Sequence, residues 1–296
     1  MNRNSPASIK ARARSVFWVS AICTVITAAV LAIYGRANLL EVLRLLGLFP
    51  VNLFDVTRSL LLTAILFAGP LFEEGIVDGN WRGWLSFGSF KRYVIDDLVT
   101  FRALVVGPVS EEVVFRSLAV SLYLLANVEP SEIVFKTPLI FGLAHLHHLN
   151  ETIVKHQTSE RSYLATAMTP SVLLSGLVMI TFQFAYTSLF GVFATFLYLR
   201  TGNVYACILA HSFCNYMGFP RVWGRLSRVA AEEVSSSVDN NNDTNDAASI
   251  HQTRAVEQPL GVEWTVAYYA LLFGGAYGFY KLLWPLTESS YALASF

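Results

Sequence analysis

Long apolar runs recur along this chain and constrain its fold more than any other feature. Several of them approach the ~20 consecutive apolar residues that an α-helix needs to cross a bilayer. Of the 296 residues, 54% are hydrophobic and only 14% are charged, whereas typical soluble domains carry roughly 25% charged residues. An all-α, polytopic membrane protein therefore explains the chain better than a soluble domain with a large core.

The apolar runs predict the order of the helices. Basic residues and no acid precede the run at 16–34, which predicts a first span with a cytosolic N-terminus. Residues 39–48 are short and amphipathic, and residues 75–97 hold tryptophans among charges, so both are expected at the membrane interface. The remaining expected spans are 53–72, 98–125, 134–149, 170–199, 204–219 and 262–284.

Two segments depart from a simple span pattern. Residues 170–199 are too long for one span, and Gln183 and Gly191 suggest a break near the middle. Residues 225–261 contain a tract rich in serine, asparagine and aspartate, which is expected to form a disordered, low-complexity loop before the last span. Residues 1–296 are otherwise predicted to form a single domain.

Charge and cysteine content exclude some functions. The formal net charge is zero, so nothing points to a nucleic-acid partner. The three cysteines are scattered among apolar runs and show neither a disulfide framework nor a metal-binding spacing.

Glu111, Glu112 and Arg116 lie inside the apolar run at 98–125. A charge at bilayer depth costs from roughly 2.5 to over 10 kcal/mol, so such groups are expected to be paired, to face a cavity or to do chemistry. A spacing of four residues predicts a Glu112–Arg116 ion pair. Glu111 lies about 100° around the helix and has no such local cation, which suits a general base near neutral pH. The alternative is a buried ion-pair cluster that only fixes helix packing.

Histidines lie in two later apolar runs. His145 is preceded by Gly142 and Ala144, small residues that permit close helix approach in a membrane. His148 follows three residues later, near the same face. His211 and Asn215, four residues apart, can donate two hydrogen bonds to one oxygen, as a developing oxyanion requires. Each group also has a plain structural explanation, since histidines occur at interfaces and asparagine holds helices together.

Together these three motifs resemble the CAAX prenyl protease 2 family, the Ras-converting type II CAAX endopeptidases within the ABI group of membrane proteases. A Glu-Glu pair followed by arginine lies on one helix, Phe-x-x-x-His on the next and His-x-x-x-Asn on a later one. The matching residues are Glu111, Glu112, Arg116, Phe141, His145, His211 and Asn215.

The resemblance implies a fold and an activity. The fold would have about eight transmembrane helices around an intramembrane cavity open to the cytosol, with a catalytic core at about 95–220. The enzyme would remove the last three residues of farnesylated or geranylgeranylated CAAX proteins, such as small GTPases, at the endoplasmic reticulum membrane. It would need no cofactor and no metal.

The resemblance also implies roles for single residues. Glu111 and His145 would activate a water, and His211 and Asn215 would stabilise the oxyanion. Glu112, Arg116, Phe141 and His148 would support them.

Two alternatives stay open at this point. Glu111, His145, His148 and His211 could instead form a zinc site of an intramembrane protease, although the usual His-Glu-x-x-His motif is absent. A non-enzymatic transporter or scaffold could use the same ionisable groups as a proton relay.

Overall fold

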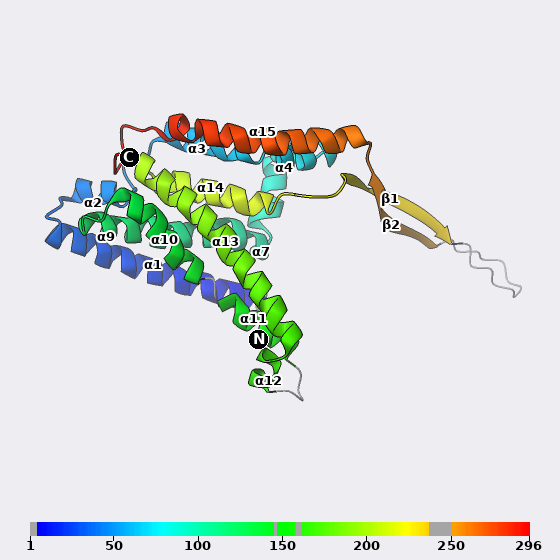
Figure 1. Cartoon of the computed structure of the whole chain (residues 1–296), viewed down its shortest axis with the longest axis horizontal. Coiled ribbons are helices and arrows are strands. Elements are labelled where there is room, and N and C mark those ends of the chain that lie inside the picture. The colour runs from blue at the N-terminus through cyan, green and yellow to red at the C-terminus, as the bar shows by residue number, and fades with distance from the viewer. Residues whose placement is uncertain (1–4, 145–146, 158–161, 237–249) are drawn as a thin grey trace, which may run out of the picture. The chain divides into compact units, whose positions relative to one another are not determined.

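The computed structural model describes residues 5–144, 147–157, 162–236 and 250–296. Its helices, coloured along the chain in Figure 1, fall into two compact units. The first unit comprises Met1–Thr63, Tyr93–Tyr216 and Leu282–Phe296, and the second comprises Ala64–Arg92 and Met217–Lys281. That the whole chain is a single domain stays a prediction.

The first unit begins with the helix α1 (Pro6–Tyr34). Ser5 caps it by accepting a hydrogen bond from the Ser8 amide, and Pro6 occupies the first turn, where no amide donor is needed. The further helices wholly within this unit are α2 (Leu39–Leu45), α7 (Leu98–Phe101), η3 (Arg102–Val106), α8 (Gly107–Glu112), η4 (Val113–Leu118), α9 (Ala119–Leu125), α10 (Pro130–Ala144), α11 (His147–His156), α12 (Tyr163–Ala167) and α13 (Pro170–Thr201). All of α14 (Val204–Met217) except its last residue also belongs to this unit.

The segment from α7 to α9 is helical without interruption, which confirms the helix predicted at 98–125. It alternates α-helical segments with the π-helical segments η3 and η4, a detail that apolar periodicity did not predict. Such π-turns are rare and frequently occur at functional sites. Here they flank α8, the segment that ends with the two glutamates.

Hydroxyl groups anchor this helical segment to the end of α2. The last carbonyls of a helix have no partner within it. The Leu45 carbonyl accepts hydrogen bonds from Ser121 and Tyr198, and the Leu46 carbonyl accepts one from Ser117 at 2.6 Å. These bonds fix the position of η4, which carries Arg116.

The helices α10 and α13 pack closely through two glycines. A Cβ atom on Gly142 would lie 2.7 Å from the Phe184 ring, and one on Gly191 would lie 2.9 Å from Pro138 Cβ. The close approach expected beside the small residues of the 134–149 span is therefore confirmed. The expected break in 170–199 is wrong, because α13 continues for 32 residues. Gly191 serves helix contact rather than a kink.

Replacing Gly191 with alanine is expected to destabilise the protein by about 1–3 kcal/mol, the usual cost of overpacking. The new methyl group would meet the Pro138 backbone, with Cα at 3.2 Å, which cannot move aside as a flexible side chain would. Thermal unfolding in detergent measures the change. Gly274→Ala is the matched control, since nothing lies within 4 Å of its added Cβ atom, and it should not lower the melting temperature. Equal melting temperatures for both variants would contradict this packing role.

The second unit contains short helices and a hairpin. The helices wholly within it are α4 (Ala68–Phe72), η1 (Glu73–Val77), α5 (Trp81–Trp84) and α6 (Phe87–Phe90). The boundaries between the units fall within helices: α3 (Leu53–Leu66), η2 (Lys91–Ile95), α15 (Val262–Thr287) and, by one residue, α14. Val77, Leu226 and Tyr268 form the buried apolar centre of the second unit. The predicted span at 53–72 is bent by 82° between Leu53–Leu66 and Ala68–Val77.

The expectation of a disordered loop at 225–261 is wrong for the residues that the structure describes there. Strands β1 (Ser227–Ser236) and β2 (Ile250–Pro259) pair antiparallel, with Glu232 opposite Arg254. Both strands contain valine, a residue favoured in strands. The Ser/Asn/Asp-rich tract between the strands led to the prediction of one loop for the whole of 225–261. Most of that tract, 237–249, lies outside the described residues.

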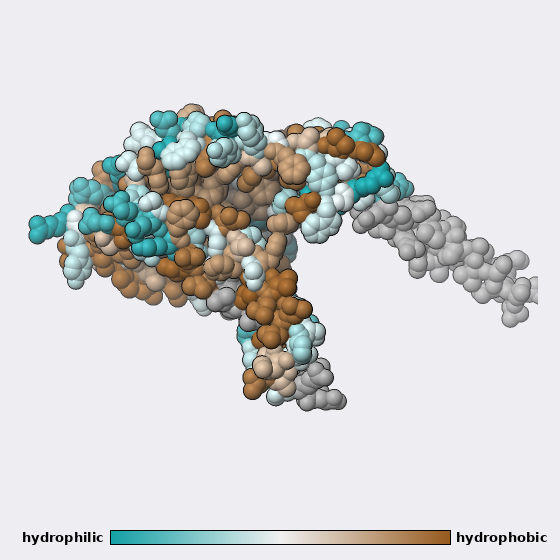
Figure 2. Space-filling model, in the orientation of Figure 1, coloured by the Kyte–Doolittle hydropathy of each residue, from teal (hydrophilic) through white to brown (hydrophobic). Residues whose placement is uncertain are grey.

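The molecule exposes a large apolar surface. In the first half of α13 the side chains of Leu174, Val178 and Phe182 are at least half exposed, four residues apart along one face. Brown, hydrophobic residues cover this helix in Figure 2. Soluble monomers rarely expose such patches, whereas lipid tolerates them. By length and composition, α1 and α13 can each cross a membrane, and the bent 53–77 pair adds a third candidate among the described residues. About eight spans are therefore not confirmed.

Candidate active site

The two glutamates at the end of α8 differ sharply in exposure. The Glu112 side chain is fully buried, whereas the Glu111 side chain is 33% exposed. Arg116, on the following π-turn, is also fully buried, and its Nη1 lies 3.0 Å from Glu112 Oε1. The ion pair predicted from the four-residue spacing is confirmed. Glu111 is the glutamate that water can reach.

His211 of α14 lies between the two glutamates. Its Nδ1 is 2.7 Å from Glu112 Oε1, and its Nε2 is 3.8 Å from Glu111 Oε2. Helical spacing predicts contacts within one helix only, so the sequence did not indicate this pairing across helices. The structure thus brings together four of the predicted site residues, Glu111, Glu112, Arg116 and His211. Glu112 is the common partner of the Arg116 guanidinium and the His211 imidazole.

Asn215 lies one turn after His211, and its amide donates to the Ala103 carbonyl at 3.0 Å. That carbonyl is available for a local reason. The Gly107 amide bonds to the Arg102 carbonyl, and the next residue along the chain, Pro108, has no amide hydrogen. The π-turn of η3 therefore offers an acceptor that orients Asn215. An amide group carries two donor hydrogens, so one such bond leaves the second for another acceptor.

Aromatic rings enclose the charged cluster. The Phe190 ring lies 4.6 Å from the His211 ring and the Phe141 ring lies 6.4 Å from it, measured between centroids. The Arg116 guanidinium lies over the same two rings, at 4.8 Å from Phe141 and 5.6 Å from Phe190. Desolvated contacts of this kind contribute roughly 2 kcal/mol.

Phe141 was predicted at the site from its motif, and the structure brings it there. Phe190 was missed, since one phenylalanine in a long apolar helix carries no distinguishing signal. Arg116 Nη2 also donates to the Gly191 carbonyl at 3.4 Å. Glycine in a membrane helix does signal close approach, and this was the one available clue to that contact.

Two polar atoms of the cluster are buried without a hydrogen-bond partner in the described part of the chain, Glu112 Oε2 and Arg116 Nε. Native proteins keep few such atoms, so each of the two calls for a specific explanation.

The remaining predicted site residues have no described side chains. His145 lies outside the described residues, and His148 is described only as part of the α11 backbone. The zinc alternative needs both, so it stays a prediction. Among the residues that were searched, no group of three or more histidine, cysteine, aspartate or glutamate side chains could hold a metal ion.

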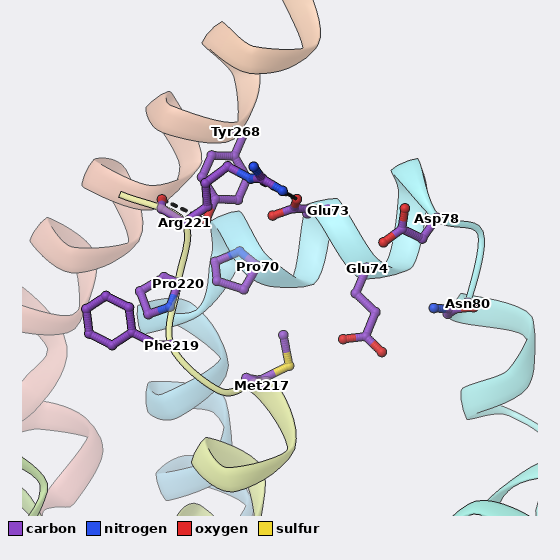
Figure 3. Close-up of a pocket in the computed structure, with 10 residues that line it drawn as sticks. All are labelled: Pro70, Glu73, Glu74, Asp78, Asn80, Met217, Phe219, Pro220, Arg221 and Tyr268. Atoms are coloured by element: carbon purple, nitrogen blue, oxygen red, sulfur yellow. Dashed lines mark hydrogen bonds and ion pairs between the residues drawn. The ribbon is translucent and has the colours of Figure 1, made fainter. Parts of the chain in front are cut away.

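A pocket of about 280 Å³ lies in the second unit and contains none of the predicted site residues (Figure 3). Arg221 donates to Glu73 Oε1 at 2.9 Å, whereas the Glu74 side chain extends away from that pair. Burial raises the pKa of Asp78, and the charges of Glu73 and Glu74 raise it further. The lining residues are Pro70, Glu73, Glu74, Asp78, Asn80, Met217, Phe219, Pro220, Arg221 and Tyr268.

Comparisons with known proteins decide the family. Residues 97–217, which include all the predicted site residues, match the family model described as type II CAAX prenyl endopeptidase Rce1-like. Probable CAAX prenyl protease 2 of Schizosaccharomyces pombe is 34% identical over 226 residues, which cover 76% of this chain and 73% of that protein. The chain belongs to the type II CAAX prenyl endopeptidase family.

Other relatives agree with this assignment. CAAX prenyl protease 2 of Homo sapiens is 37% identical over 238 residues, covering 76% of this chain and 65% of that protein. The Arabidopsis thaliana protein of the same name is 33% identical over 223 residues, covering 69% of this chain and 68% of that protein. No solved structure matches the chain at a significant level. The expected enzyme class, a protease and hence a hydrolase, is confirmed, as is a multi-pass membrane protein.

Proposed function

We propose that this type II CAAX prenyl endopeptidase removes the C-terminal three residues from farnesylated or geranylgeranylated CAAX proteins, small GTPases among them. The proposal rests on the family together with one observation. A partly exposed glutamate, Glu111, lies beside His211, while the neighbouring Glu112 is buried in an ion pair. The enzyme would act in the endoplasmic reticulum membrane, on substrates that reach it from the cytosol.

Glu111 and His145 activate the attacking water in this mechanism. Glu111 accepts the proton as the water attacks the scissile carbonyl, and then returns a proton to the leaving amine. The exposure of Glu111 suits this role, since a general base must reach water. Glu112 is unsuited to it, because its charge is buried against Arg116 and His211.

His211 and Asn215 stabilise the oxyanion of the tetrahedral intermediate. Donors held in fixed positions contribute most where water is excluded. The aromatic rings of Phe141 and Phe190 keep the His211 side of the site apolar, and the Ala103 carbonyl holds Asn215.

Cleavage is expected to depend on the prenyl group. Each buried CH₂ contributes about 0.8 kcal/mol, so burial of even four such groups gives about 3 kcal/mol, or roughly a 10²-fold preference. The test compares kcat/KM for a farnesylated CAAX peptide and for the same peptide with a free thiol, using the purified chain in vesicles. Equal values for the two peptides would contradict the proposal and indicate a general membrane peptidase.

A further inference from the structure

Glu112 contacts both Arg116 and His211 through the same carboxylate oxygen. Its Oε1 accepts from Arg116 Nη1 at 3.0 Å and lies 2.7 Å from His211 Nδ1. The Glu112 and Arg116 side chains are fully buried, and the His211 side chain is 8% exposed. A guanidinium is always protonated in proteins. Because the guanidinium has donors only, Glu112 Oε1 accepts the hydrogen in this contact.

The short distance between Glu112 and His211 indicates which ring nitrogen of His211 carries a hydrogen. A carboxylate only accepts hydrogen bonds, so a 2.7 Å contact with Oε1 requires the hydrogen to be on His211 Nδ1. The opposite ring nitrogen, Nε2, then faces Glu111 Oε2 at 3.8 Å. That distance is too long for a direct hydrogen bond.

The surrounding side chains hold the ring in this orientation. Phe190 and Phe141 contact the imidazole, and the Arg116 guanidinium lies over both of their rings. Arg116 is further held by the Gly191 carbonyl of α13. Rotating the imidazole by half a turn would remove its bond to Glu112 and leave a buried carboxylate with one partner fewer, which is unfavourable.

We propose that Glu112 is a positioning residue that fixes His211 as the Nδ1–H form, with Nε2 presented to Glu111. This inference deepens the proposed function, and its catalytic consequence rests on that function. Because Nδ1–H is committed to Glu112, Nε2 is the ring atom that meets the reacting groups. It donates to the oxyanion when the ring carries hydrogens on both nitrogens, and the Glu112 carboxylate balances that charge.

Nitrogen-15 NMR of the full chain in lipid bilayers, with labelled histidines, tests the assignment without any substrate. Loss of signals in His211→Gln identifies those of His211. The wild type should show a hydrogen on His211 Nδ1. A spectrum in which Nδ1 is bare and only Nε2 carries hydrogen would overturn the proposal. Since no cleavage is measured, this result stands or falls separately from the proposed function.

A double variant, Glu112→Gln with Arg116→Met, tests the role of the carboxylate without leaving a lone buried charge. A glutamine can present either its oxygen or its nitrogen to His211. A population with a bare Nδ1 should therefore appear, and kcat per folded protein should fall by about 10²–10⁴-fold, as when an imidazole loses its orienting carboxylate. An unchanged spectrum would overturn the proposal. Glu111→Gln is the matched control, since that glutamate faces Nε2, and its spectrum should keep the hydrogen on Nδ1.

Discussion

Turnover of a farnesylated CAAX peptide is expected to fall by ~10²–10⁴-fold when Glu111 is replaced with glutamine, the usual loss for a general base. Glutamine keeps the shape of the side chain and its ability to hydrogen bond, but it cannot take a proton at neutral pH. The folded protein should be as abundant as the wild type, because the Glu111 side chain is 33% exposed and does not balance a buried charge alone. Steady-state kcat and the melting temperature are measured together.

The matched control is Glu129→Gln, an exposed glutamate at the end of the α9–α10 connection, which should leave kcat unchanged. The assignment would be reversed by an active Glu111→Gln enzyme together with a folded but inactive Glu112→Gln enzyme. The general base would then be Glu112.

Of the substitutions considered, removing the positive charge of Arg116 should lower the stability of the protein most. Arg116→Met leaves the buried Glu112 carboxylate with His211 as its side-chain partner and without the fixed positive charge of the guanidinium. Breaking a buried ion pair by removing one partner costs roughly 3–5 kcal/mol. The double variant, Glu112→Gln with Arg116→Met, removes both charges and should recover part of this loss. The wild type should have the highest melting temperature, the double variant a lower one and the single variant the lowest. A single variant as stable as the wild type would show that the ion pair does not stabilise the fold.

The sequence predicted best those features that depend on residues close to one another along a single helix. The uninterrupted helical segment at 98–125 and the Glu112–Arg116 contact both follow from local periodicity. Close packing beside Gly142 followed from the need of membrane helices for small residues at contacts. In each case the information lies within a few residues of the feature it predicts.

What the sequence did not predict depends on contacts between distant segments or on backbone detail. His211 is 99 residues from Glu112, and no spacing rule links them. The apolar periodicity does not distinguish α-helical from π-helical turns. The sequence therefore did not predict that the Ala103 carbonyl would be available to accept from Asn215. Gly191 suggested a break in α13, although its function is to let Pro138 approach. The polar tract in 225–261 hid the strands on either side of it.

The central claim, cleavage at one defined bond of a prenylated substrate, is tested most directly by the identity of the products. Purified protein in vesicles is incubated with a farnesylated CAAX peptide, and all products are identified by mass spectrometry. We expect one intact tripeptide and one peptide that ends at the farnesylated cysteine, both absent with Glu111→Gln. Stepwise loss of single residues, or cleavage at another bond, would contradict the account.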